Sequence, residues 1–496
     1  METVVTTHAG DVRGRVTDGV HAFQGVPFAA PPYGDDRFRP PRPVEPWDGV
    51  RDAVEYGPKS PQPTYPPEVR IILPELVGAG EDCLTLNVWT PDPEATDLPV
   101  MVWISGGMYE FHGTSASPWY DGSRFARDEV VCVTISYRVG ADGFLYLDDG
   151  VANVGLLDQV SALEWVRENV AAFGGDPENV TIFGESAGAM SVATLLATPR
   201  AEGLFHRAVA QSGAAQAVMS PESGLRVARR LADHLGVDAT RAAIAAAPVD
   251  RVLEAQSAVR SDLSADPDPG AWGGELVTSM LPWQPVVDGD VLPGPPLERV
   301  RDGAAADVDL LVGTNTDEHR LFLVVGGALD QVTEDALEGV VAAYGAPVGE
   351  TLAAYREDAP DASPGDVLAA VQTDWYWRVP AVRLADAHAA SGGTTYSYEF
   401  AWPSPQYDGR LGACHALEIP FVFDTLGEET DALWGERPPQ SLADAMHADW
   451  IEFASSGDPG WPTHDANRRA TMHYGRSNRV VEDPLAATLS VWEGVR

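Results

Sequence analysis

The chain has 496 residues, of which 44% are hydrophobic and 22% are charged, the balance of an ordinary globular protein. Its 74 acidic and 33 basic side chains give a formal net charge of −41, which repels phosphate backbones and anionic lipid surfaces. Nucleic acids are therefore not expected as partners, and a neutral or cationic small molecule is favoured.

The N-terminal segment 1–8 has neither the basic region nor the apolar core of a signal peptide, and no stretch approaches 18 uninterrupted apolar residues. The three cysteines (Cys83, Cys132 and Cys414) are too few and too scattered for a disulfide framework or a zinc site. We therefore expect a cytoplasmic protein, monomeric, without a membrane span and without a metal or cofactor.

In chain order, apolar runs predict strands at 100–104, 130–135, 180–183, 209–211, 310–313 and 396–400. Apolar residues at steps of three and four predict helices at 156–173 and at 187–197. Strands that alternate with helices indicate an α/β protein with a mostly parallel sheet and helices on both faces. The segments from about 220 to 305 and from about 325 to 392 are more helical, and we expect them to cover the C-terminal edge of the sheet.

The segment Gly184-Glu185-Ser186-Ala187-Gly188 falls between the strand at 180–183 and the helix that begins at Ala187. A Gly-x-Ser-x-Gly motif is weak on its own in a chain with 48 glycines, but a strand-to-helix turn is its setting in hydrolases. The turn exposes the hydroxyl, and the helix N-terminus directs free N–H groups to the same point. Ser186 is the predicted nucleophile. The alternative is a helix-capping serine between two packing glycines.

A nucleophilic serine needs a base to take its proton and an acid to orient that base, and on this architecture both follow the serine in the chain. Five histidines could serve: His388, His415, His447, His464 and His473. His388 and His447 lie in helical patterns and His473 in a strand-like run, whereas His415 and His464 lie in loops. Asp317 and Glu318 both follow the strand at 310–313. From the residues alone, the choice of base and the choice of acid stay open.

Further motifs are spread over nearly the whole chain, at 23–29, 81–89, 155–159, 173–177, 181–188, 211–213, 285–289, 412–420 and 453–459. Together they resemble those of type-B carboxylesterases, the family of bacterial para-nitrobenzyl esterases, animal liver carboxylesterases and cholinesterases. The resemblance implies a single α/β-hydrolase catalytic domain over 1–496, with cap-like excursions at about 220–305 and 325–392. It also implies a bacterial enzyme.

Carried over by position, the family's acid falls on Glu318 and its histidine on His415, which implies a triad with Ser186. The oxyanion hole of the family would use the backbone N–H groups of Gly107, Met108 and Ala187. Here the chain departs from its relatives, because the loop reads Ser105-Gly106-Gly107-Met108 instead of beginning with His or Tyr and ending in Gly or Ala. His319 likewise replaces the usual glycine after the acid.

Two further residues resemble family residues next to the triad, Glu185 beside the nucleophile and Ser212 in the Gln-Ser-Gly motif. For both, a purely structural role is an equal alternative.

The resemblance implies hydrolysis of small neutral carboxylic esters, aliphatic or aromatic and including phthalate-type esters, through an acyl-enzyme. Five aromatic residues are candidates for lining a pocket: Trp119, Tyr120, Trp375, Tyr376 and Trp377. Choline esters are not expected, because the loop 69–74 lacks the tryptophan that holds the cation in cholinesterases. The alternative function is that of a catalytically inactive binding protein on the same fold, which the retention of all three triad residues disfavours.

Overall fold

The computed structural model describes residues 2–65, 67–70, 72–73, 77–357, 359–427 and 431–495. The strands are β1 (Glu2–Thr6), β2 (Asp11–Thr17), β3 (Val20–Pro27), β4 (Val50–Asp52), β5 (Thr85–Thr90), β6 (Leu98–Ile104), β7 (Val131–Ile135), β8 (Gly175–Glu185), β9 (Arg207–Gln211), β10 (Asp309–Asn315), β11 (Thr395–Phe400), β12 (Ala470–Tyr474) and β13 (Arg479–Glu482).

The helices are α1 (Pro67–Arg70), α2 (Ser123–Arg127), α3 (Gly140–Phe144), α4 (Val154–Asn169), α5 (Ala187–Leu195), α6 (Pro221–Leu235), α7 (Arg241–Ala245), α8 (Val249–Ala265), α9 (Pro269–Trp272), α10 (Gly274–Ser279), α11 (Pro296–Arg301), α12 (Arg320–Val325), α13 (Glu334–Ala343), α14 (Val348–Glu357), α15 (Pro364–Thr373), α16 (Val379–Ala390), α17 (Ile419–Val422), α18 (Asp431–Trp434), α19 (Gln440–Ser456) and α20 (Ala486–Leu489).

All these strands belong to one sheet in the order β1-β2-β3-β5-β7-β6-β8-β9-β10-β11-β12-β13, with β4 paired to β2. Neighbours from β7 to β12 are parallel, whereas β1, β2, β3 and β5 pair antiparallel at one edge and β13 pairs antiparallel at the other. The prediction of an α/β-hydrolase fold with a mostly parallel sheet is confirmed.

The sheet separates two hydrophobic cores, because successive side chains of a strand point to opposite faces. In β6, Val100, Val102 and Ile104 belong to the core that includes α4 and α5, whereas Met101 and Trp103 belong to the core that includes α19. All five side chains are fully buried. A parallel strand that is covered on both faces is apolar throughout, and this explains why the run lacks a polar alternation.

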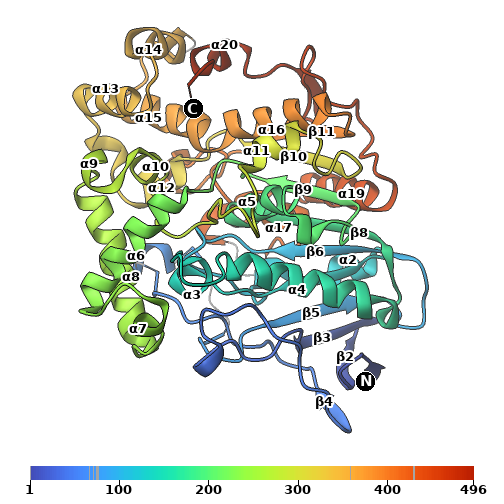
Figure 1. The fold of residues 1–496 in the computed structure, drawn as a ribbon. Helices are drawn as coiled ribbons and strands as arrows, with labels where there is room; N and C mark the ends of the chain where they lie inside the picture. Colours follow the sequence, from blue (N-terminus) through green and yellow to red (C-terminus); the bar gives the residue numbers. More distant parts are fainter. Residues whose placement is uncertain are drawn as a thin grey trace.

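Two helical segments interrupt the sequence of parallel strands. Helices α6 to α11 lie between β9 and β10, and α12 to α16 lie between β10 and β11. Figure 1 shows α6 to α10, coloured green to yellow, grouped at one side of the sheet. Both segments contribute residues to the pocket described below, since α8 brings Arg260 and α12 brings Phe322. None of the helices within the described ranges is long and apolar enough to cross a membrane.

Candidate active site

Ser186 lies at the turn between β8 and α5, with a φ of 58° and a ψ of −124°. Such a backbone conformation is costly for a residue other than glycine and persists only where its surroundings enforce it. A Cβ on Gly184 would lie 2.6 Å from the carbonyl oxygen of Ile104, and one on Gly188 only 2.0 Å from it. Both glycines are therefore required, because the turn packs directly against the end of β6.

Glu318 follows β10 and is hydrogen-bonded to Nδ1 of His415. One of its carboxylate oxygens accepts a hydrogen bond from His415 Nδ1 at 2.7 Å, and the other accepts one from the backbone N–H of Asn315 at 2.8 Å. The Glu318 side chain is completely buried. A histidine whose Nδ1 donates to a carboxylate presents Nε2 as its reactive nitrogen, the arrangement that a general base requires.

His415 Nε2 lies 3.1 Å from Glu185 Oε1. Among the described residues no hydrogen bond joins Ser186 Oγ to His415, although both side chains line the same pocket. Catalytic hydrogen bonds of an empty enzyme are often long and tighten only around a bound substrate. His415 thus lies between the carboxylates of Glu318 and Glu185. Glu185 faces Nε2, the nitrogen that would take the proton.

Burial and neighbouring charge control the ionisation of this group. Burial by itself lowers the pKa of His415, but the carboxylates of Glu185 and Glu318 outweigh it and raise that pKa to about 9. Burial raises the pKa of Glu185 well above its ordinary value; His415 opposes this rise, and the carboxylates of Glu418 and Glu318 add to it. Glu185 and His415 therefore compete for one proton.

A further buried carboxylate, Glu418, lies beneath these residues. It accepts hydrogen bonds from Asn315 Nδ2 at 2.7 Å and from Gln211 Nε2 at 3.2 Å. Burial, with the charge of Glu318 added, raises its pKa to about 7. Glu418 was not among the site residues predicted from the sequence, although its position three residues after His415 in an apolar segment was an available signal.

The glycine-rich loop beside the pocket has left-handed backbone conformations at Gly107, Met108 and Tyr109. Gly107 has a φ of 108°, and a Cβ on it would lie 2.3 Å from the carbonyl oxygen of Phe111, so only glycine fits. Met108 follows with a φ of 59°. A Cβ on Gly106 would lie 2.9 Å from Ser186 Cβ, which places the loop against the nucleophile. The N–H groups of Gly107, Met108 and Ala187 make no hydrogen bond to a described residue, so they are available to an oxyanion.

Ser186, Glu185, His415, Gly107 and Met108 line one pocket of about 300 Å³. Its apolar wall consists of Val69, Ile72, Leu73, Phe111, Trp119, Tyr120, Leu321, Phe322, Val325 and Ile419. Of the loop 69–74, residues 71 and 74 lie outside the described residues. The pocket is of a size and polarity that suit a small apolar molecule.

Two of the five aromatic candidates, Trp119 and Tyr120, line this pocket, and the other three do not. Trp375 stacks on Tyr344 at 4.2 Å between ring centroids, in a separate core. Tyr376 stacks on His319 at 5.5 Å, and Trp377 packs on the ring of His415 at 5.1 Å. Consecutive side chains of a helical turn point in different directions, so three adjacent aromatic residues could not all face one cavity.

Ser212 is completely buried and has a φ of 51°. Its backbone N–H donates to the carbonyl oxygen of Gly313 at 2.8 Å, and its Oγ has no hydrogen-bond partner among the described residues. A Cβ on the next residue, Gly213, would lie 2.5 Å from the carbonyl oxygen of Ser186. Ser212 therefore lies behind the nucleophile turn and does not line the pocket.

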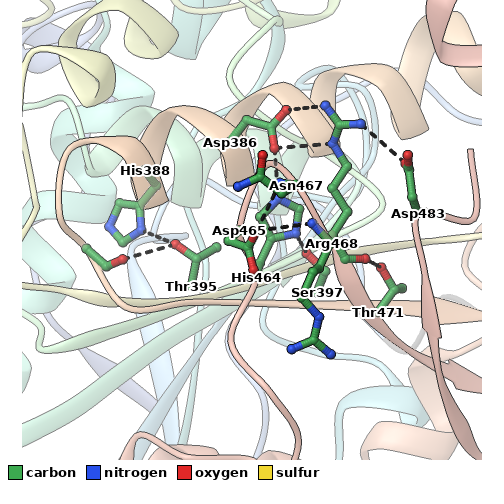
Figure 2. Close-up of polar contacts among 12 residues, drawn as sticks. Asp386, His388, Thr395, Ser397, His464, Asp465, Asn467, Arg468, Thr471 and Asp483 are labelled. Atoms are coloured by element: carbon green, nitrogen blue, oxygen red, sulfur yellow. Dashed lines mark hydrogen bonds and ion pairs between the residues drawn. The ribbon is translucent and has the colours of Figure 1, made fainter. Parts of the chain in front are cut away.

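The two alternatives that the residues left open lie elsewhere. Figure 2 shows His464 between Ser397 and Asp386. Its Nδ1 is hydrogen-bonded with Ser397 Oγ at 2.8 Å, and its Nε2 with Asp386 Oδ1 at 2.9 Å. These are the residue types of a triad, but Ser397 lies within β11 and the adjoining cavity is only about 40 Å³. Asp317 pairs with Arg320 at 3.4 Å and not with His415. Within the described residues, no cluster of His, Cys, Asp or Glu could hold a metal ion.

Residues 1–492 match the model of the carboxylesterase family. The chain is 37% identical to the para-nitrobenzyl esterase of Bacillus subtilis, over 97% of this chain and 96% of that protein. It is also 37% identical to the phenmedipham hydrolase of Pseudarthrobacter oxydans, over 97% of each chain. A solved carboxylesterase of Geobacillus stearothermophilus superposes with a TM-score of 0.85 at 38% identity, over 99% of this chain and 100% of that one. The chain therefore belongs to the carboxylesterase family and is a carboxylic ester hydrolase.

Proposed function

We propose that the protein is a serine carboxylesterase that hydrolyses small neutral esters through an acyl-enzyme intermediate. The observation that carries this proposal is the meeting of three elements in one pocket of about 300 Å³: the strained serine turn, a histidine that is held by a buried glutamate, and the N–H groups of the glycine loop. One catalytic domain, a cytoplasmic location and a monomeric state remain predictions of the sequence.

In the proposed mechanism, His415 Nε2 takes the proton of Ser186 Oγ as that oxygen attacks the ester carbonyl carbon. Glu318 keeps the imidazole ring oriented through Nδ1 and stabilises its positive charge. The N–H groups of Gly107, Met108 and Ala187 bind the oxyanion. His415 then gives the proton to the departing alcohol oxygen. A water molecule then attacks the acyl-enzyme in the same way, with His415 as the base, and the carboxylic acid is released.

We assign Glu185 a supporting role in the same cycle. Its carboxylate lies 3.1 Å from His415 Nε2, so its charge favours the imidazolium that forms as the serine attacks. The same charge makes the neutral imidazole, which the first step needs, harder to reach. Glu185 therefore sets the pH range of the reaction through its charge on His415.

The preferred esters are expected to be aliphatic or aromatic, phthalate-type esters included. The apolar wall with Phe111, Trp119, Tyr120 and Phe322 offers rings against which an acyl or aryl group can pack. The two curated relatives described above act, by their names, on a para-nitrobenzyl ester and on phenmedipham. Neither name suggests that a charged substrate is required.

A serine-directed fluorophosphonate and a series of para-nitrophenyl esters of increasing acyl length test this proposal. We expect the probe to label Ser186, and Ser186→Ala to lose both labelling and several orders of magnitude in kcat/KM. Ser397→Ala is the matched control, because Ser397 is hydrogen-bonded with His464 in the second group of serine, histidine and aspartate. This variant should keep both the labelling and the wild-type kcat/KM. Turnover that survives in Ser186→Ala, or is lost in Ser397→Ala, would reject the assignment.

A further inference from the structure

Besides the groups assigned above, the pocket contains a cationic side chain, that of Arg260. It comes from α8 and lies among the pocket-lining residues with Ser186, Met108 and Phe111. Its guanidinium carbon lies 5.2 Å from the centre of the Phe111 ring, so the cation lies over an aromatic face of the wall. The Arg260 side chain is 24% exposed, hence accessible from the pocket.

The guanidinium is fixed by a buried acid. Arg260 Nε donates to Glu110 Oε2, and Nη2 lies at ion-pair distance from the same oxygen. Glu110 is completely buried, and its other oxygen accepts a hydrogen bond from Gln256 Nε2 at 3.2 Å. Gln256 Oε1 in turn accepts from the backbone N–H of Ala141 at 2.8 Å. A guanidinium held in this way loses little freedom when it binds a further group.

One nitrogen of the guanidinium is left for a ligand. Nη1 of Arg260 makes no hydrogen bond to any described residue, whereas Nε and Nη2 face Glu110. The Arg260–Glu110 pair is neutral as a whole, and Glu185 adds a second acid to the pocket. A free carboxylate would therefore gain no net charge attraction here. A neutral carbonyl oxygen needs only the N–H donor.

We propose that Arg260 binds a second carbonyl group of the substrate, so that the enzyme prefers neutral diesters, in which a distal ester carbonyl accepts a hydrogen bond from Nη1. This inference rests on the proposed serine-esterase function and deepens it by naming the substrate class. Arg260 and Ser186 are both anchored to the fold, so the preference is greatest at one distance between the two carbonyl groups.

The experiment compares diesters with monoesters of equal acyl length. The kcat/KM values of diethyl succinate, glutarate, adipate and pimelate are measured by pH-stat and halved for their two equivalent esters. Each is divided by the value for ethyl butanoate, pentanoate, hexanoate or heptanoate. For the wild type we expect this ratio to rise to about tenfold at one chain length, the effect of one hydrogen bond to a charged donor.

The test variant is Glu110→Gln/Arg260→Met, because removing Arg260 alone would leave Glu110 as an unpaired buried charge. We expect its ratio to be near one at every chain length. The diester-to-monoester ratio is taken within each protein. If the substitution of Glu110 disturbs the adjoining loop at Gly107 and Met108 and lowers all activity, both rates fall together and the ratio is unaffected. Arg251→Met is the control, since Arg251 lies on the same helix in an exposed pair with Glu254 at 3.2 Å, and it should keep the wild-type profile.

The outcomes separate the two proposals. A wild-type ratio near one at all lengths, with monoester hydrolysis that depends on Ser186, overturns the role of Arg260 and leaves the esterase function standing. If the wild type hydrolyses neither the diesters nor the monoesters, both the role of Arg260 and the esterase function are overturned. Monoethyl dicarboxylates that react faster than the diesters would show that the site binds a charge, and would overturn the preference for a neutral carbonyl. A wild-type ratio near one at every length overturns the role of Arg260 even if the double variant does not fold.

Discussion

Replacing Glu185 by glutamine should move the pH dependence of catalysis toward lower pH. Glu185 Oε1 lies 3.1 Å from His415 Nε2, and its charge is the largest contribution that raises the pKa of this histidine to about 9. Glutamine keeps the size of the side chain and removes the charge. With less stabilisation of the imidazolium, the neutral base is available at lower pH.

The distance between Glu185 Oε1 and His415 Nε2 gives an upper limit for the change in the pKa of His415. At an effective dielectric constant of about 20, unit charges 3.1 Å apart interact by about 5 kcal/mol, a ceiling of about 4 pH units. Burial raises the pKa of Glu185 itself and so opposes its charged form, and we therefore expect the effect of its charge to be smaller than this ceiling. We expect a downward move of about 2 pH units. At pH 7 the neutral fraction of His415 would then rise from about one in a hundred to about one half.

The assay is kcat/KM for ethyl butanoate from pH 6 to pH 10, with each profile scaled to its own plateau. Activity falls as pH decreases through the pKa of the free enzyme's base, so the wild-type midpoint should lie near pH 9 and that of Glu185→Gln near pH 7. Glu418→Gln is the comparison, because Glu418 contributes least among the causes given for His415. An unchanged midpoint in Glu185→Gln, or a larger move in Glu418→Gln, would refute the reasoning.

Met108 lines the pocket, so Met108→Ala should improve kcat/KM for a tertiary-butyl ester relative to an ethyl ester, by about 1–3 kcal/mol at most. A lower melting temperature with an unchanged ratio of the two esters would instead show that the Met108 side chain packs in the core. His464→Ala should keep the pH midpoint but lose about 2 kcal/mol of stability in a denaturant titration, because Ser397 and Asp386 each lose a partner. The net charge of −41 predicts a melting temperature that rises from very low to about 0.5 M NaCl as repulsion is screened, and a flat curve would exclude this effect.

Local patterns in the sequence were sufficient for the centre of the sheet and for the serine turn. The apolar run at 180–183 lies within β8, and the helix predicted from Ala187 is α5, because strand, turn and helix adjoin in the chain. The same local patterns did not predict the antiparallel strands β1, β2, β3 and β5. These strands lie at the edge of the sheet or carry polar residues such as Asn87, whose buried amide hydrogen-bonds to Thr134 and to the backbone of Ser115. Their apolar pattern is therefore weaker than that of β6 or β7.

What the residues left open was decided by contacts between distant parts of the chain. His415 and His464 both lie in loops, and only the folded chain places one against Glu318 and the pocket and the other against Ser397 and Asp386. No periodicity could have shown that Glu185 faces His415, which is far from it in the sequence, or that Arg260 of α8 pairs with Glu110. The sequence by itself determined the elements and the nucleophile turn, since these depend on neighbouring residues. Only the tertiary structure decided the partners and charges of the site, because they depend on how β8, β10 and the two helical segments pack together.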